Sequence, residues 1–238
     1  MLAITSFSQS GFEKYGRKLL ESIDNWPGDI VVYYEVSPPD FKHPKIEYKN
    51  LFFIEEAGVP ICANFLQYIR DIPLAHGQTE NGYNYNYDLW KFCRKVFAQW
   101  DILRNHTGQA FWLDADCIIK KPVALSQLEE LFDEKGLALL GRTGFYTETG
   151  VVGFDTRNEK FGEFLQTYID FLRKGKVFLL PRWHDCEMLD WARDLSGISW
   201  NNLSPFFEFK EQISLDEMDV LPKTKLGEFI KHNKGHLK

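Results

Sequence analysis

The sequence predicts an α/β fold, a three-layer α/β/α sandwich in which a mostly parallel central sheet lies between two layers of helices. Two observations lead to this prediction. The first 36 residues read strand–helix–strand, because apolar runs at 2–7 and 30–36 flank a segment with helical spacing. The second run, IVVYYEV, is continuously apolar, which is typical of a strand buried on both faces of a parallel sheet.

Each later element follows from a local pattern. The first helix carries apolar residues at helical spacing from Phe12 to Ile23 and ends at Pro27-Gly28. The clearest helix spans 87–105, where the apolar residues fall on one stripe. After about residue 200 the pattern weakens. The other expected elements are strands at 45–54, 109–114, 137–141 and 151–155, helices at 60–71, 125–136, 159–175 and 186–194, and a Tyr- and Asn-rich loop at 78–88.

Composition narrows the class of protein. The 238 residues are enough for one substantial core and contain no evident linker, so we expect a single domain over 1–238. The net charge of −6 argues against a nucleic-acid partner. No apolar run approaches the ~20 residues of a membrane span, and the first residues lack the pattern of a signal peptide. Four scattered cysteines without a C-x-x-C pair indicate reduced thiols in a cytoplasmic protein.

The motif that carries chemistry is FWLDADCII at 111–119. Asp114 and Asp116 follow an apolar strand, and in an extended chain both side chains would leave the same side. Adjacent carboxylates repel each other and favour a divalent cation beside them, and oxygen ligands suit Mg²⁺ or Mn²⁺. Ligands of open α/β sheets bind beyond the carboxyl ends of strands, where this pair is expected. A turn that caps the following segment is the plainer interpretation.

A hydrophobic strand that ends in D-x-D, in mid-chain and after an N-terminal βαβ unit, resembles the GT-A glycosyltransferases, whose fold is a Rossmann-like sandwich. Many of these enzymes carry a basic residue on the helix before the motif, facing the diphosphate or the sugar. Lys91, Arg94 and Lys95 lie on the corresponding helix, and Lys95 is the first choice for this role. The alternative for each is a solvated basic face.

Two later segments fit the same family pattern. ETGVVGFDT at 148–156 resembles the small-residue strand under the donor sugar. WHDCEMLDW at 183–191 resembles the helix start whose acids meet sugar or acceptor hydroxyls, so Asp185 and Glu187 are the catalytic candidates. Carboxylates at a helix start are also ordinary partners of the helix dipole. Cys186 departs from the pattern, because the family often has a polar amide there.

The C-terminal residues His232, Gly235 and Lys238 form H-x-x-G-x-x-K. This spacing resembles the C-terminal motif of the retaining glycogenin and lipopolysaccharide galactosyltransferase group, in which the His is the third metal ligand and the Lys meets the diphosphate. The Pro-Trp that usually follows the Lys is absent here. A disordered basic tail is the plainer interpretation.

The resemblance implies a hexosyltransferase that uses Mn²⁺ or Mg²⁺. It would move a sugar from a nucleotide-diphosphate donor, with UDP-sugar expected, to a hydroxyl of a glycan or other acceptor. Asp114 would meet the donor through the metal, and Thr5, Ser6 and Phe7 would meet its base or ribose. The C-terminal motif favours a retaining reaction, whereas an inverting one needs a carboxylate base, for which Asp185 is the candidate.

Three other classes of protein remain as alternatives. Haloacid-dehalogenase-type phosphatases also place D-x-D after an apolar strand, but normally at the first strand, and here about 110 residues precede the motif. A sugar-nucleotide pyrophosphorylase needs a Gly-rich basic loop after the first strand, which TSFSQSGFEK lacks. The richness in aromatic residues also permits a non-enzymatic carbohydrate-binding protein.

Overall fold

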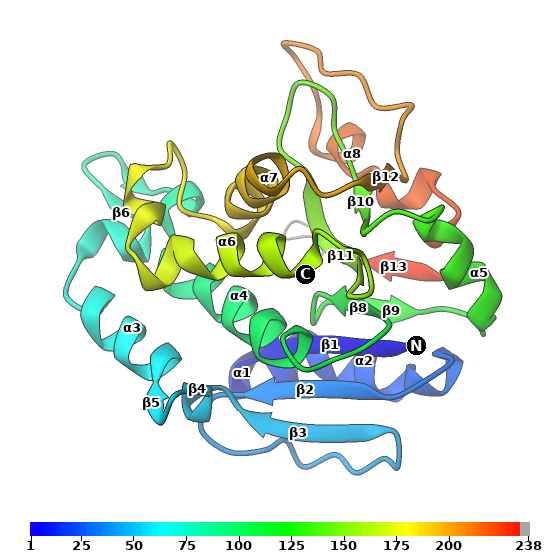
Figure 1. The fold of residues 1–238 in the computed structure, drawn as a ribbon, viewed down its shortest axis with the longest axis horizontal. Helices are drawn as coiled ribbons and strands as arrows, with labels where there is room; N and C mark the ends of the chain where they lie inside the picture. Colours follow the sequence, from blue (N-terminus) through cyan, green and yellow to red (C-terminus); the bar gives the residue numbers. More distant parts are fainter. Residues whose placement is uncertain (234–238) are drawn as a thin grey trace.

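A seven-stranded sheet forms the centre of the molecule (Figure 1). The computed structural model describes residues 1–233, apart from the side chains of residues 215 and 216. Only β11 runs antiparallel to its neighbours, so the predicted mostly parallel sheet is confirmed. In sheet order the strands are β12 (Trp200–Asn202), β10 (Leu137–Leu140), β11 (Glu148–Asp155), β8 (Gln109–Leu113), β1 (Leu2–Phe7), β2 (Ile30–Tyr34) and β3 (Ile46–Asn50).

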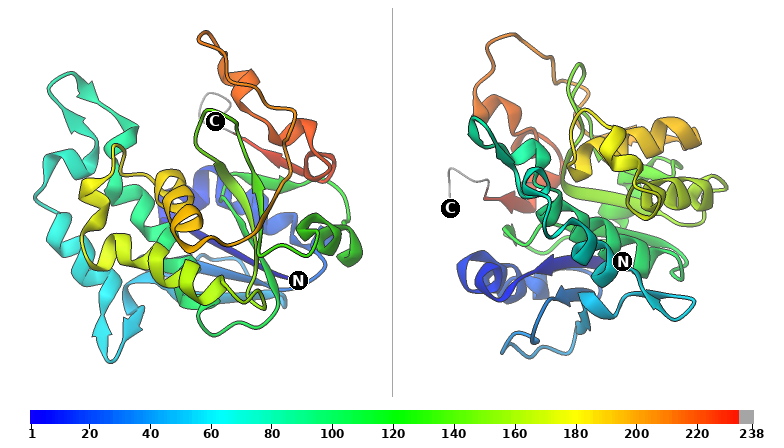
Figure 2. Two further views of the ribbon diagram at one scale, coloured as in Figure 1. Left: turned by 45° about the horizontal axis from the view of Figure 1, so that its top comes forward. Right: turned by 90° about the vertical axis from the view of Figure 1, so that its left-hand side faces the viewer.

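Helices cover both faces of this sheet, which confirms the predicted three layers (Figure 2). One face carries α3 (Ile61–Ile69), α4 (Leu89–Leu103), α6 (Phe161–Arg173) and α7 (Asp185–Ser196). The other carries α1 (Gln9–Gly11), a π-helical turn, α2 (Arg17–Glu21) and α5 (Leu125–Glu129). Successive strand residues alternate between the two cores, as Ile4 and Ala3 do. No helix in the described part of the chain combines the length and apolar character that a membrane span requires.

Several predicted boundaries are wrong, each for a local reason. The helix expected at 125–136 ends before Gly136, because Asp133 and Glu134 adopt positive φ angles of 47° and 58°. The first helix begins earlier than Phe12, since the Ser8 side chain accepts from the Gly11 N–H and caps it. The expected loop at 78–88 holds a small hairpin of β6 (Gln78–Thr79) and β7 (Gly82–Tyr83).

The last part of the described chain returns to its middle. Strand β13 (Ile230–His232) pairs antiparallel with β9 (Cys117–Ile119), so that His232 lies opposite Cys117. Three-residue strands carry no periodic signal, which is why this pairing was not predicted from the sequence. Ile230 and Ile119 face each other in the same apolar core and hold the pairing in register. Residues 230–232 are thereby fixed next to the D-x-D motif.

Replacing Ile230 with alanine is expected to lower the free energy of unfolding by roughly 2–5 kcal/mol, because a fully buried side chain leaves a cavity. Lys231→Ala is the matched control, since its side chain is exposed on the same strand and its loss is expected to cost less than about 0.5 kcal/mol. Urea unfolding followed by circular dichroism measures both. Equal effects of the two substitutions would contradict the packing role of β13.

Candidate functional site

The D-x-D motif forms a turn at the carboxyl end of β8. The Asp114 N–H donates to the Gly150 carbonyl at 2.8 Å and extends the ladder with β11. The Cys117 N–H then donates to the Asp114 carbonyl at 2.9 Å, so the chain reverses at once. The expectation of an extended motif was therefore wrong. The turn still brings both carboxylates together, and their oxygens and a His232 nitrogen all lie within 4.8 Å of one another.

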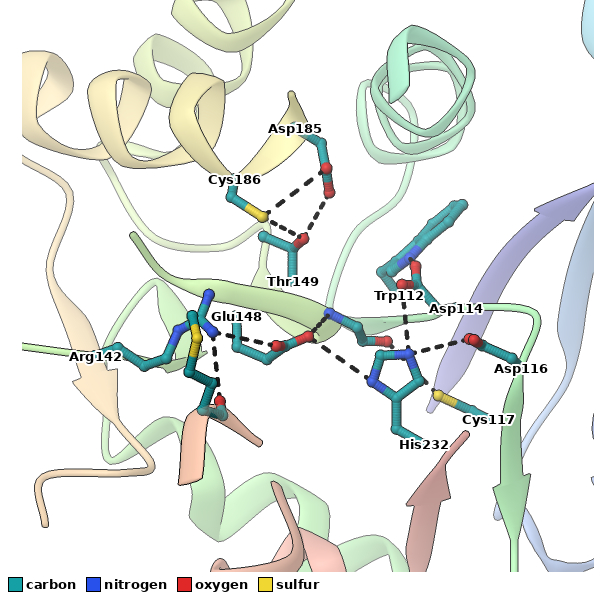
Figure 3. A network of polar contacts seen from close by, with 12 residues as sticks. Trp112, Asp114, Asp116, Cys117, Arg142, Glu148, Thr149, Asp185, Cys186 and His232 are labelled. Carbon is teal, nitrogen blue, oxygen red and sulfur yellow. Dashed lines mark hydrogen bonds and ion pairs between the residues drawn. The ribbon is translucent and has the colours of Figure 1, made fainter. Parts of the chain in front are cut away.

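His232 joins the two aspartates through β13. Its Nε2 lies 3.0 Å from Asp116 Oδ1 and 3.8 Å from Asp114 Oδ2 (Figure 3). Burial would lower the pKa of His232, but the hydrogen bond to Asp116 and the nearby carboxylates outweigh it, so the pKa is raised. The structure thus assembles the three predicted metal ligands. Gly235 and Lys238, the other members of the C-terminal motif, lie outside the described residues.

Lys95 links the motif to α7. Its buried ammonium donates to Asp114 Oδ1 at 3.1 Å and to the Thr149 carbonyl at 2.5 Å, and it lies 2.8 Å from Asp185 Oδ2. An ammonium has three protons, and these three acceptors use all of them. Lys95 therefore lines the cavity, but its charge faces protein carboxylates.

Asp185 begins α7 and is almost fully buried. Burial alone would raise its pKa, but the charge of Lys95 and hydrogen bonds from Lys95 and Thr149 hold the pKa below its ordinary value. The structure does not bring Glu187 to the same place. Glu187 contacts Arg182 at 3.2 Å and is not among the residues that line the cavity.

A cavity of about 850 Å³ opens beside these groups. Ser6 and Phe7 line it at the carboxyl end of β1, together with Lys91 and Arg94 from α4. Thr5 is not part of this lining. Its side chain is fully buried, and its Oγ1 has no hydrogen-bond partner among the described residues. Of the three residues predicted at the end of the first strand, two therefore face the cavity.

Several cavity residues were missed from the sequence, among them Glu148 at the start of β11 and His184. The position of His184 directly before a helix was an available signal, since its Nδ1 caps α7 by accepting from the Glu187 N–H at 3.1 Å. The His184 ring packs against the rings of Tyr85 and Tyr146. Burial lowers its pKa to about 4, so the imidazole is neutral near pH 7.

Comparison with solved structures identifies the fold of this chain. No protein-family model matches the sequence, and no curated protein matches it. The solved structure of mouse xyloside xylosyltransferase 1 aligns with 99% of this chain and 98% of its own, at 9% identity and a TM-score of 0.53. The galactosyltransferase LgtC, solved with donor and acceptor sugar analogues, aligns with 99% of this chain and 87% of its own, at 10% identity and a TM-score of 0.50.

A third solved structure is longer than this chain. The glycosyltransferase GlyE of Streptococcus pneumoniae TIGR4 aligns with 85% of this chain, at 14% identity and a TM-score of 0.47, and the alignment spans 44% of its own length. At such identities the likeness to xyloside xylosyltransferase 1 and LgtC is evidence of fold. The chain has the GT-A glycosyltransferase fold, which confirms the prediction. The phosphatase alternative is not favoured.

His184 is expected to make the fold less stable in mild acid. Between pH 6.5 and about 4 the unfolded chain binds a proton on this ring that the folded chain does not, so stability falls as pH falls through this window. At about pH 5 the loss from this group is roughly 2 kcal/mol relative to neutral pH. His184→Asn keeps a capping oxygen without the titration and removes this part of the loss.

Urea unfolding of both proteins at about pH 5 and about pH 7.5 measures the difference. Carboxylates that titrate in acid do so in both proteins and cancel in the comparison. The same loss of stability in His184→Asn as in the parent would show that His184 is not the group responsible.

Proposed function

We propose that this chain is a metal-dependent glycosyltransferase that moves a sugar from a nucleoside diphosphate donor to a hydroxyl of a carbohydrate or other acceptor, and that residues 1–238 act as one such domain. One observation carries the proposal. Two carboxylates and an imidazole converge within 4.8 Å at the carboxyl end of a central strand, beside a cavity of about 850 Å³. A cavity of this size is at the upper end of the range for small-molecule sites.

The three converging side chains fit a divalent cation. Asp114 and Asp116 offer carboxylate oxygens, and His232 offers Nε2, a set of ligands that suits Mn²⁺. Mg²⁺ would be held by the two carboxylates alone. His232 lies in β13, which pairs with β9, and the two aspartates lie in the turn between β8 and β9. When bound, the cation would act as a Lewis acid that stabilises the negative charge on the departing diphosphate.

The donor would lie along the carboxyl ends of the strands, as ligands of open α/β sheets do. We assign the nucleotide to the side of the cavity lined by Ser6 and Phe7 at the end of β1, with UDP as the expected nucleotide. The sugar would then lie toward β11 and the start of α7, within reach of Asp185. The galactosyltransferase LgtC, which was solved in complex with donor and acceptor sugar analogues, supports both kinds of partner here.

The environment of Asp185 supports a retaining reaction. Its lowered pKa makes it a poor base, since a carboxylate held by Lys95 and Thr149 takes up a proton weakly. In the retaining reaction the bond between the anomeric carbon and the diphosphate breaks, the acceptor oxygen bonds to the same face, and its proton passes to the departing phosphate oxygen. Asp185 then serves by accepting hydrogen bonds from sugar hydroxyls.

The test combines Asp116→Ala with a thermal-shift screen of nucleotide sugars. With Mn²⁺, a donor at 100 times its Kd is expected to stabilise the parent protein by about 2.7 kcal/mol. Asp116→Ala is expected to abolish both this shift and sugar transfer, whereas Asp71→Asn, a surface carboxylate, should change neither. Full transfer activity in EDTA would overturn metal dependence, and the absence of a shift with every donor would overturn the transferase function.

A further inference from the structure

The two ring nitrogens of His232 face two different acidic groups. Nε2 faces the D-x-D carboxylates, while Nδ1 lies 3.8 Å from Oε1 of Glu148 (Figure 3). The ring is nine-tenths buried, and Nδ1 has no hydrogen-bond partner among the residues that the structure describes. Burying a ring N–H without a partner is costly, so the group that faces Nδ1 decides whether this nitrogen can carry the proton.

The chemistry of a metal-binding imidazole explains what this second group can do. A neutral imidazole has one proton, so a lone pair on Nε2 for a cation requires the proton on Nδ1. Histidine ligands almost always donate that proton to a carboxylate, carbonyl or water, which fixes the tautomer and the ring orientation. Glu148 is the carboxylate in the required position.

Glu148 is itself held in place. Its Oε1 accepts from the Gly150 N–H at 3.0 Å, and its Oε2 lies 3.7 Å from the guanidinium of Arg142. Arg142 is buried and donates to the carbonyls of Tyr146 and Met218. The carboxylate is thus oriented before any ligand arrives.

The His232 ring packs directly against Gly150. A Cβ on this glycine would lie 2.4 Å from Cε1 and 2.5 Å from Nδ1 of His232, closer than van der Waals contact allows. The imidazole therefore packs against bare backbone of β11, two residues from Glu148 on the same strand. One short segment supplies both the surface that receives the ring and the acceptor that faces its Nδ1.

We propose that Glu148 is a positioning residue for the metal site: it accepts a hydrogen bond from Nδ1–H of His232 and so keeps the Nε2 lone pair directed at the cation. The proposal rests on the metal-dependent function proposed above. Glu148 is not itself a metal ligand in this proposal. The distance of 3.8 Å between its Oε1 and His232 Nδ1 is expected to shorten to a hydrogen bond when a cation binds Nε2.

The test is a titration of the purified full chain with Mn²⁺, with free Mn²⁺ measured by electron paramagnetic resonance. Glu148→Ala is expected to weaken binding by roughly 10- to 100-fold, the usual effect of losing such a partner. Glu148→Gln should fall between the parent and Glu148→Ala, because its amide oxygen still accepts a hydrogen bond but carries no charge. Glu56→Gln, a carboxylate paired with Arg173 away from the cavity, is the matched control and should bind like the parent.

A double-mutant comparison shows whether Glu148 acts through His232. In a His232→Ala background, Glu148→Ala is expected to cause no further loss of Mn²⁺ affinity. An equal loss in both backgrounds, or no loss in the parent, would overturn the positioning role while leaving the metal-dependent function intact. Failure of the parent to bind Mn²⁺ would overturn both. Circular dichroism confirms folding, and Glu148→Gln serves if Glu148→Ala does not fold.

Discussion

The site depends on the balance of charge around the Lys95 ammonium. Asp114, Asp116, Glu148 and Asp185 all line one cavity, and carboxylates this close destabilise one another. Lys95 contacts Asp114 and Asp185 directly, so moving either carboxylate away from the ammonium costs free energy. Since a buried ammonium must keep its partners, the end of β8, the start of β11 and the start of α7 are fixed relative to one another.

The direction of β11 explains why so many functional groups meet at this edge of the sheet. Parallel strands bring their carboxyl ends to one edge, where α/β proteins bind ligands. Because β11 runs the opposite way, its first residues reach that same edge. Glu148 faces His232, the Thr149 carbonyl accepts from Lys95, and the Gly150 carbonyl accepts from Asp114. A seventh parallel strand would have placed these groups at the far end of the molecule.

The sequence predicted what local patterns encode and missed what tertiary contacts decide. Continuous apolar runs identified the central strands, and helical periodicity identified the long helices, because burial on two faces or on one imposes these patterns. The D-x-D at 114–116 was recognised, but a turn there was only an alternative, since the hydrogen bond that closes it depends on the chain reversing into β9. His232 was found only through family resemblance, because β13 has three residues and no period. Glu148 was missed because its role depends on the facing ring of His232.

The hydrogen bonds of the cavity also distinguish groups that can move a proton from groups that can only hold a ligand. Asp185 accepts from Thr149 and faces Lys95, and both contacts favour its charged form. Protonation of Asp185 would remove one of the two negative charges that Lys95 contacts and leave only Asp114. In the retaining reaction proposed above, the acceptor proton would therefore leave more easily with the phosphate, whose own charge would grow as the bond to the sugar breaks. The same contacts hold Asp185 in place, so in the proposed reaction its carboxylate would position the sugar and would not take up the proton.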